Sequence, residues 1–135
     1  MAKTTIYLDN AATTWPKPEA VYRAVDTAMR EHGANPGRGS YRMSVEAQRL
    51  VDETRQEVRR LFNAPAPERV IFTLNCTDAL SMALKGLIKS GDRVVSGPFE
   101  HNSVARPLHS LRRGGAQVAV VRATGTFGVD LDHFR

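Results

Sequence analysis

Three polar segments of the sequence contain residue types that could bind a ligand or move a proton. The first, Leu74-Asn75-Cys76-Thr77-Asp78, lies between a β-prone run and an apolar-periodic helix. Backbone N–H groups at a helix start are unpaired and partly positive, so a phosphate placed there gains hydrogen bonds without a lysine. Thr77 adds a hydroxyl. The alternative is that Thr77 or Asp78 only caps the helix, and spacing alone favours that alternative.

The second segment is Phe99-Glu100-His101-Asn102-Ser103, which follows the next expected strand. Ligands of open α/β sheets usually bind at that end of a strand. His101 could therefore stack on an aromatic ligand or transfer a proton. A lone loop histidine is more often solvated than functional, so the residue type alone does not make His101 catalytic.

The third candidate combines two polar, turn-like stretches, Asp9–Thr14 and Asn35–Ser40, although spacing alone makes neither a site. Cys76 is the single cysteine, which excludes an intramolecular disulfide, and without a CxxC partner a structural zinc site is not expected. No base lies near Cys76 in the sequence, so we interpret it as a structural loop residue. No histidine has metal-ligand spacing, and no metal is expected.

Helices and strands that alternate along the chain would position these segments. Strands alternating with helices predict a parallel sheet with right-handed crossovers and flanking helices, which is an α/β fold. The expected order is helix 18–31, loop 33–40, helix 44–62, strand 70–73, helix 77–88, strand 93–96, helix 103–113 and strand 116–121.

The last residues, 128–135, resemble a turn that feeds a new helix with Asp130 as its N-cap. Three strands would leave an exposed sheet edge. From the sequence we therefore expect a truncated domain, in preference to a small three-stranded one with a frayed tail.

Composition excludes several classes of protein. The net charge is +5, from 19 basic and 14 acidic residues, but the basic residues are scattered among acidic ones. This pattern favours a solvated surface over a nucleic-acid interface. No apolar run is long enough to span a membrane, and the N-terminus lacks the apolar core of a signal peptide, so we expect no membrane partner and a cytoplasmic location.

Taken together, four segments in order resemble the class V aminotransferase and cysteine desulfurase family. Tyr7–Thr14 is similar to the family's N-terminal signature, and Asn35-Pro36 with its glycine- and serine-containing loop resembles the next family segment. Val70–Leu80 resembles the strand and phosphate loop, and Glu100–Val104 resembles the histidine motif. The resemblance covers essentially the whole chain.

The resemblance implies the N-terminal part of the large domain of a fold-type I pyridoxal 5'-phosphate enzyme. Residues 1–42 would form an N-terminal arm, helix and loop, and residues 43–135 the start of the cofactor-binding domain. By resemblance, Cys76 and Thr77 bind the cofactor phosphate, and His101 stacks on the pyridine ring and assists proton transfer as the catalytic residue. Ala11, Ala12 and Asn35 would border the substrate pocket.

The sequence departs from the family pattern in two ways. The phosphate loop reads Cys76-Thr77-Asp78 where the family usually has glycine or alanine, threonine and glutamate. The family's cofactor-binding lysine and aspartate are expected beyond this stretch of sequence, because none of the four lysines (Lys3, Lys17, Lys85 and Lys89) sits in the lysine motif. Whether this chain alone can catalyse a reaction is therefore left open.

The expected function is that of a fragment of a homodimeric enzyme that acts on an amino acid, of the cysteine desulfurase type. One alternative is a class V aminotransferase such as an amino acid–pyruvate enzyme, which would share this front part. The alternative from another class is a non-enzymatic α/β module that binds a phosphate ligand or a protein.

Overall fold

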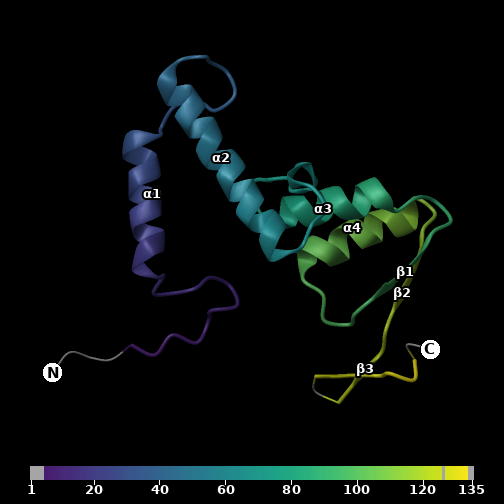
Figure 1. Ribbon diagram of the computed structural model, residues 1–135. Coiled ribbons are helices and arrows are strands. Elements are labelled where there is room, and N and C mark those ends of the chain that lie inside the picture. The colour runs from purple at the N-terminus through teal and green to yellow at the C-terminus, as the bar shows by residue number, and fades with distance from the viewer. Residues whose placement is uncertain (1–4, 126, 134–135) are drawn as a thin grey trace. The chain divides into compact units, whose positions relative to one another are not determined.

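A computed structural model describes residues 5–125 and 127–133 of the chain (Figure 1). The chain divides into two compact units, residues 1–70 and residues 71–135. The first contains α1 (Glu19–Glu31), α2 (Arg42–Leu61) and the 3-10 turn η1 (Pro67–Arg69). The second contains α3 (Cys76–Leu87), β1 (Arg93–Ser96), α4 (Asn102–Arg113), β2 (Gln117–Val120), β3 (Ala123–Thr124) and β4 (Gly128–Val129).

The amphipathic spacing predicted the helices of the first unit to within two residues. Pro18 is the residue before α1 rather than its first residue. Both helices have charged side chains four residues apart that form ion pairs, such as Arg30–Asp26 at 2.7 Å and Arg49–Glu53 at 2.6 Å. These pairs are solvent-exposed, so each adds little to helix stability.

The loop that precedes α2 is fastened to the first turn of that helix. Ser44 is completely buried, and its hydroxyl donates a hydrogen bond to the Asn35 carbonyl oxygen at 3.0 Å. Gly39 accommodates the Tyr41 ring, because a Cβ at position 39 would lie 2.4 Å from a ring carbon. Gly37 has φ 76°, in the left-handed region that favours glycine. The loop conformation therefore depends on α2.

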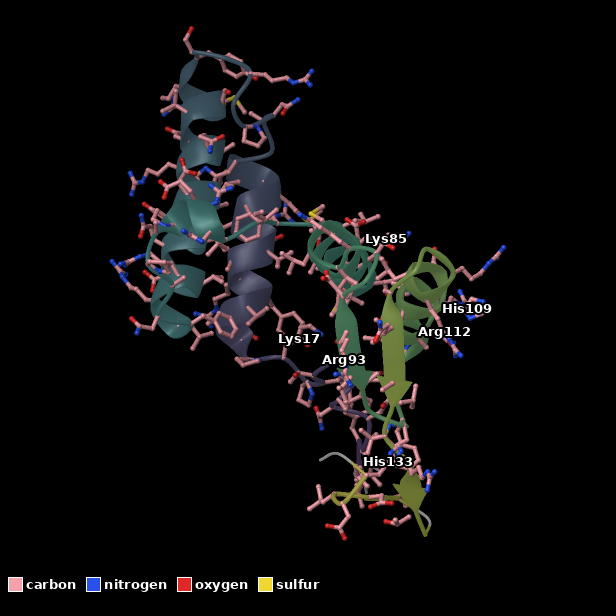
Figure 2. All side chains as sticks on the ribbon, turned by 90° about the vertical axis from the view of Figure 1, so that its right-hand side faces the viewer. Lys17, Lys85, Arg93, His109, Arg112 and His133 are labelled. Atoms are coloured by element: carbon pink, nitrogen blue, oxygen red, sulfur yellow. The ribbon has the colours of Figure 1, made fainter. Side chains whose placement is uncertain are left out.

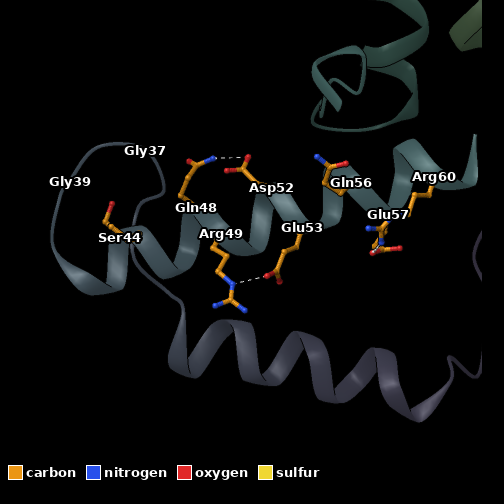
Figure 3. A pocket seen from close by; sticks show the side chains of 11 residues that line it. Gly37, Gly39, Ser44, Gln48, Arg49, Asp52, Glu53, Gln56, Glu57 and Arg60 are labelled. Carbon is orange, nitrogen blue, oxygen red and sulfur yellow. Dashed lines mark hydrogen bonds and ion pairs between the residues drawn. The ribbon is translucent and has the colours of Figure 1, made fainter. Parts of the chain in front are cut away.

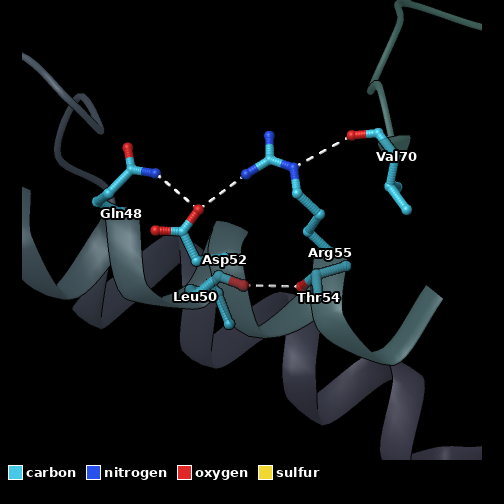
Figure 4. Close-up of polar contacts among 6 residues, drawn as sticks. All are labelled: Gln48, Leu50, Asp52, Thr54, Arg55 and Val70. Atoms are coloured by element: carbon cyan, nitrogen blue, oxygen red, sulfur yellow. Dashed lines mark hydrogen bonds and ion pairs between the residues drawn. The ribbon is translucent and has the colours of Figure 1, made fainter. Parts of the chain in front are cut away.

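The predicted strand over Val70–Thr73 is wrong: this segment pairs with no strand among the described residues. The Val70 N–H donates to the Pro67 carbonyl at 2.9 Å. Its carbonyl accepts from Arg55 Nε at 3.1 Å, and the same guanidinium donates to Asp52 at 2.8 Å (Figure 4). Both backbone groups of Val70 are thus used locally and not in a sheet.

The second unit contains a small parallel sheet with α4 as the crossover helix. β1 and β2 pair in parallel from Arg93↔Gln117 to Ser96↔Val120, as the alternation of strands and helices predicted, although with two strands instead of three. α4 begins one residue before its predicted start and buries Pro107 and Leu108. The α/β class is therefore confirmed.

A short antiparallel pair that the sequence did not predict follows β2. β3 and β4 pair at Ala123↔Val129 and Thr124↔Gly128. The Asp130 carboxylate then accepts hydrogen bonds from the N–H groups of Asp132 and His133, at 3.1 and 3.0 Å. This is the bonding pattern of an N-cap, as predicted for Asp130. Residues 131–133 form a bend and a turn and not a helix, and the rest of the expected helix lies outside the described residues.

Candidate functional site

The start of α3 presents backbone donors with no acceptor in the chain. Asn75 is the N-cap, and its side-chain oxygen accepts from the Asp78 N–H at 2.9 Å. The interpretation of Thr77 or Asp78 as the cap is therefore wrong, because Asn75, three residues before Asp78, accepts from the Asp78 N–H. In the described part of the chain, nothing accepts from the Cys76 or Thr77 N–H. These two groups and the Thr77 hydroxyl remain available to a ligand.

The start of α4 holds the imidazole of His101 in one orientation. His101 is the N-cap of this helix, and its Nδ1 accepts a hydrogen bond from the Ser103 N–H at 3.1 Å. The Ser103 hydroxyl lies 2.9 Å from the same nitrogen. Because a backbone N–H can only donate, Nδ1 is unprotonated and the proton of the neutral ring is on Nε2. No described residue bonds to Nε2.

A cavity between α3 and α4 brings Thr77 and His101 together. It has a volume of about 420 Å³ and lies entirely within the second unit. α3 contributes Thr77, Ser81 and Lys85, which are four residues apart and so share one face of the helix. The residues from α4 and its cap are His101, Asn102, Ser103, Arg106 and Pro107. Cys76 is not among the lining residues.

The lining of this cavity contains hydroxyls and cations but no carboxylate. Asp78 and Glu100, the nearest acidic residues in sequence, both lie outside it. Lys85 (labelled in Figure 2) and Arg106 make no ion pair or hydrogen bond with any described residue. The cavity therefore favours an anion. Lys85 and Arg106 were not predicted as site residues from the sequence. The four-residue repeat of Thr77, Ser81 and Lys85 was the signal for Lys85, and Arg106 had none.

A second, larger cavity lies along α2 in the first unit (Figure 3). Its volume is about 580 Å³, and each charged residue that lines it is in an ion pair along α2, as in the Arg49–Glu53 pair. The hydrogen bond and charge of Glu53 raise the pKa of Arg49 above its ordinary value. Arg49 is thus charged at every working pH, and this cavity has no unpaired charge comparable to that of Lys85 and Arg106.

The predicted substrate residues Ala11 and Ala12 lie in a compact polar turn of the first unit. The Ala12 N–H donates to the Asp9 carbonyl at 3.1 Å. The Tyr7 hydroxyl spans the turn, within 3.0 Å of the Asp9 carbonyl and 2.8 Å of the Thr13 carbonyl. The turn therefore keeps both alanines exposed.

Asn35, the third predicted substrate residue, is exposed in the loop that Ser44 fastens. Ala11, Ala12 and Asn35 belong to the first unit, and Thr77 and His101 to the second. A pocket shared by all of them therefore remains a prediction.

No group of three or more histidine, cysteine or carboxylate side chains that could hold a metal ion occurs within residues 5–125 and 127–133. Over the same residues, no helix combines the length and apolar character needed to cross a membrane. Cys76 is a free, exposed thiol.

Comparison with known proteins decides the family. A family model described as aminotransferase class-V matches residues 6–135. This chain belongs to the class V aminotransferase family. The resemblance seen in the sequence is therefore confirmed for nearly the whole chain.

Relatives of this class V chain include proteins named as cysteine desulfurases. A probable cysteine desulfurase of Methanothermobacter thermautotrophicus is 40% identical over 119 residues, covering 87% of this chain and 29% of the relative. A cysteine desulfurase IscS of Methylobacillus flagellatus is 30% identical over 98% of this chain and 34% of its own length. The chain thus spans about a third of the length of these curated relatives.

Solved structures agree with the fold of this class V chain. The apo structure of cysteine desulfurase from Thermococcus onnurineus NA1 matches with a TM-score of 0.80 and 30% identity, over 95% of this chain and 32% of that one. The α/β arrangement described above is thus similar to that of about a third of this cysteine desulfurase.

Proposed function

We propose that this chain forms the cofactor-phosphate region of a pyridoxal-phosphate-dependent enzyme of the cysteine desulfurase type, acting on an amino acid. The observation that carries the proposal is the cavity between α3 and α4. It places the Thr77 hydroxyl, at a helix start with two free N–H groups, together with the His101 ring. The names of the relatives support the desulfurase type.

The residues at the start of α3 fit the phosphate of this cofactor. The free N–H groups of Cys76 and Thr77 and the Thr77 hydroxyl would bind its oxygens, and the positive end of the helix favours the negative charge. Backbone donors do not depend on the side chain, so Cys76 can replace the family's usual glycine or alanine. The shortened Asp78 does not line the cavity.

His101 fits a position beside the cofactor ring. Its Nδ1 is held by the Ser103 N–H, so the ring plane is oriented by the backbone and Nε2–H remains available to a ligand. When bound, pyridoxal phosphate supplies the electron sink for amino-acid chemistry, while the protein supplies binding, orientation and electrostatics. His101 would then stack on the ring and hold or transfer a proton at Nε2.

We further propose that Ala11, Ala12 and Asn35 border the substrate pocket and that the enzyme is a cytoplasmic homodimer without a nucleic-acid or membrane partner. The exposed apolar residues Val25 and Met29 on α1 support a protein interface. Transamination is a second candidate, because the matching family is described as aminotransferase class-V.

Binding of pyridoxal phosphate to Thr77→Val tests the proposal. Equilibrium dialysis of the protein, in the length that its gene encodes, gives the dissociation constant. Loss of a hydrogen bond to a charged group weakens binding by about tenfold or more. Thr54→Val is the matched control, because the Thr54 hydroxyl bonds the Leu50 carbonyl within α2, at 2.8 Å (Figure 4). Equal dissociation constants for wild type and Thr77→Val would refute the assignment.

A further inference from the structure

The cavity between α3 and α4 extends beyond the residues that the proposed cofactor needs. Thr77 and Lys85 are eight residues apart on one face of α3, a rise of roughly 12 Å. His101 and Arg106 are five residues apart on α4 and its cap, a shorter rise of roughly 7.5 Å. Because the two helices lie side by side and run in the same direction (Figure 1), the cavity has one end at their N-termini and a second end at Lys85 and Arg106.

The second end of the cavity contains two cations without a counter-charge. Lys85 and Arg106 come from different helices, and neither pairs with a carboxylate in the described part of the chain. Lys89 and Arg113 of the same unit also make no ion pair with a described residue, but unlike Lys85 and Arg106 they do not line the cavity. Lys85 and Arg106 both line the cavity, so an anion bound there would be attracted by both charges.

The polar groups around these cations suit a tetrahedral oxyanion. Ser81 lies one turn before Lys85 on the same face of α3 and offers a hydroxyl. The Arg106 guanidinium presents several N–H donors in a planar fork, and the Lys85 ammonium adds a compact positive charge. Pro107 also lines the cavity from α4, and its ring adds no competing donor.

We propose that Lys85 and Arg106, with Ser81, form a second oxyanion subsite that binds a phosphate or sulfate group. This subsite is distinct from the helix start at Cys76 and Thr77. It does not require the proposed cofactor to bind, because its donors are side chains one to two turns farther along α3 and α4.

Calorimetric titration of the gene-length protein with inorganic phosphate, at low ionic strength, tests the subsite. The titration is run with and without saturating pyridoxal phosphate. We expect saturable phosphate binding in both states. Lys85→Gln and Arg106→Gln should each weaken it by about tenfold, because each removes one charge-assisted contact.

The matched controls are Lys89→Gln and Arg113→Gln, which remove the same charge from the same unit at exposed positions outside the cavity. They should change phosphate affinity less than about twofold, because Lys89 and Arg113 do not line the cavity, whereas the equally exposed Lys85 and Arg106 do. Equal weakening by controls and test variants, or no saturable binding, would overturn the proposal. A thermal melt of each variant confirms that it is folded.

Two further titrations separate the subsite from its neighbour and identify the source of the anion. Thr77→Val should weaken pyridoxal phosphate and leave phosphate binding at Lys85 and Arg106 unchanged, so failure of the cofactor assignment and failure of the subsite give different results. Glycerol 3-phosphate is then compared with inorganic phosphate. Equal affinities support recognition of the oxyanion alone, and tighter binding of the ester supports a phosphorylated ligand. Saturable binding of neither ligand overturns the subsite.

Discussion

At the scale of single residues, two capping side chains determine what the site can offer. Asn75 satisfies the Asp78 N–H, and His101 satisfies the Ser103 N–H. Asn75 therefore leaves the first two N–H groups of α3 free for a ligand, and His101 leaves its Nε2 free. The two caps have different consequences, because only His101 is also a proposed ligand-binding group.

Asn75→Ala should destabilise the protein by about 1 kcal/mol, since it removes the cap of α3. Denaturant unfolding measures the change. Asn75→Asp retains a cap oxygen and should restore most of the stability. An alanine variant as stable as wild type would mean that the Asp78 N–H does not depend on Asn75.

His101→Asn separates the cap from the imidazole, because asparagine is also a good N-cap. We expect unchanged unfolding free energy with weaker binding of pyridoxal phosphate, whereas His101→Ala should lose both stability and binding. The readouts are denaturant unfolding and equilibrium dialysis. If His101→Asn binds pyridoxal phosphate as tightly as wild type does, His101 has only the structural role of a helix cap.

At the scale of elements, we expect the hydrogen bond from Ser44 on α2 to hold the loop over 33–40 in place. Ser44→Ala removes the buried hydrogen bond to the Asn35 carbonyl and should cost about 1 kcal/mol. The freed loop should be cut faster by trypsin at the exposed Arg38. Ser40→Ala is the control, because Ser40 is exposed and makes no hydrogen bond to a described residue. Equal cleavage rates for the two variants would contradict this role.

Most helices and strands could be predicted from the sequence, but three short segments could not. Helices were predictable because their apolar spacing is local, and β1 and β2 because short apolar runs were bounded by turns. The strand over 70–73 was wrong because pairing, not composition, makes a strand, and Arg55 binds the Val70 carbonyl instead. β3 and β4 have two residues each, too few for an alternating pattern.

The site was predictable in part. Thr77 and His101 follow from their position after expected strands and from the family resemblance, and the structure places both on one cavity. Lys85 and Arg106 could not be predicted, because their proximity depends on how α3 and α4 pack. The capping role of Asn75 was missed because the helix begins one residue earlier than expected, at Cys76.

At the scale of the whole molecule, exposed apolar side chains are the main feature. Met29 is 75% exposed and Val25 53% exposed, on the same face of α1. Apolar groups of this extent mark interaction surfaces. They support the proposed homodimer, in which α1 would be covered by protein.

Val25→Lys should therefore weaken self-association, because it places a charge in the proposed interface. Analytical ultracentrifugation over a range of concentrations should show a dimer for wild type and more monomer for the variant. Thr27→Lys, on a different face of α1, is the charge-matched control and should remain dimeric. If wild type is monomeric at all concentrations, or the two variants dissociate equally, α1 is not the interface.

The most direct test of the cofactor site is amide hydrogen exchange, followed by NMR, with and without pyridoxal phosphate. Without the cofactor, the unpaired N–H groups of Cys76 and Thr77 should exchange rapidly, because no described residue accepts from them. With the cofactor bound, both should be protected, and the His101 ring resonances should shift. Saturable binding that leaves the Cys76 and Thr77 amides unprotected would contradict the assignment of α3 and α4 as the cofactor-phosphate site.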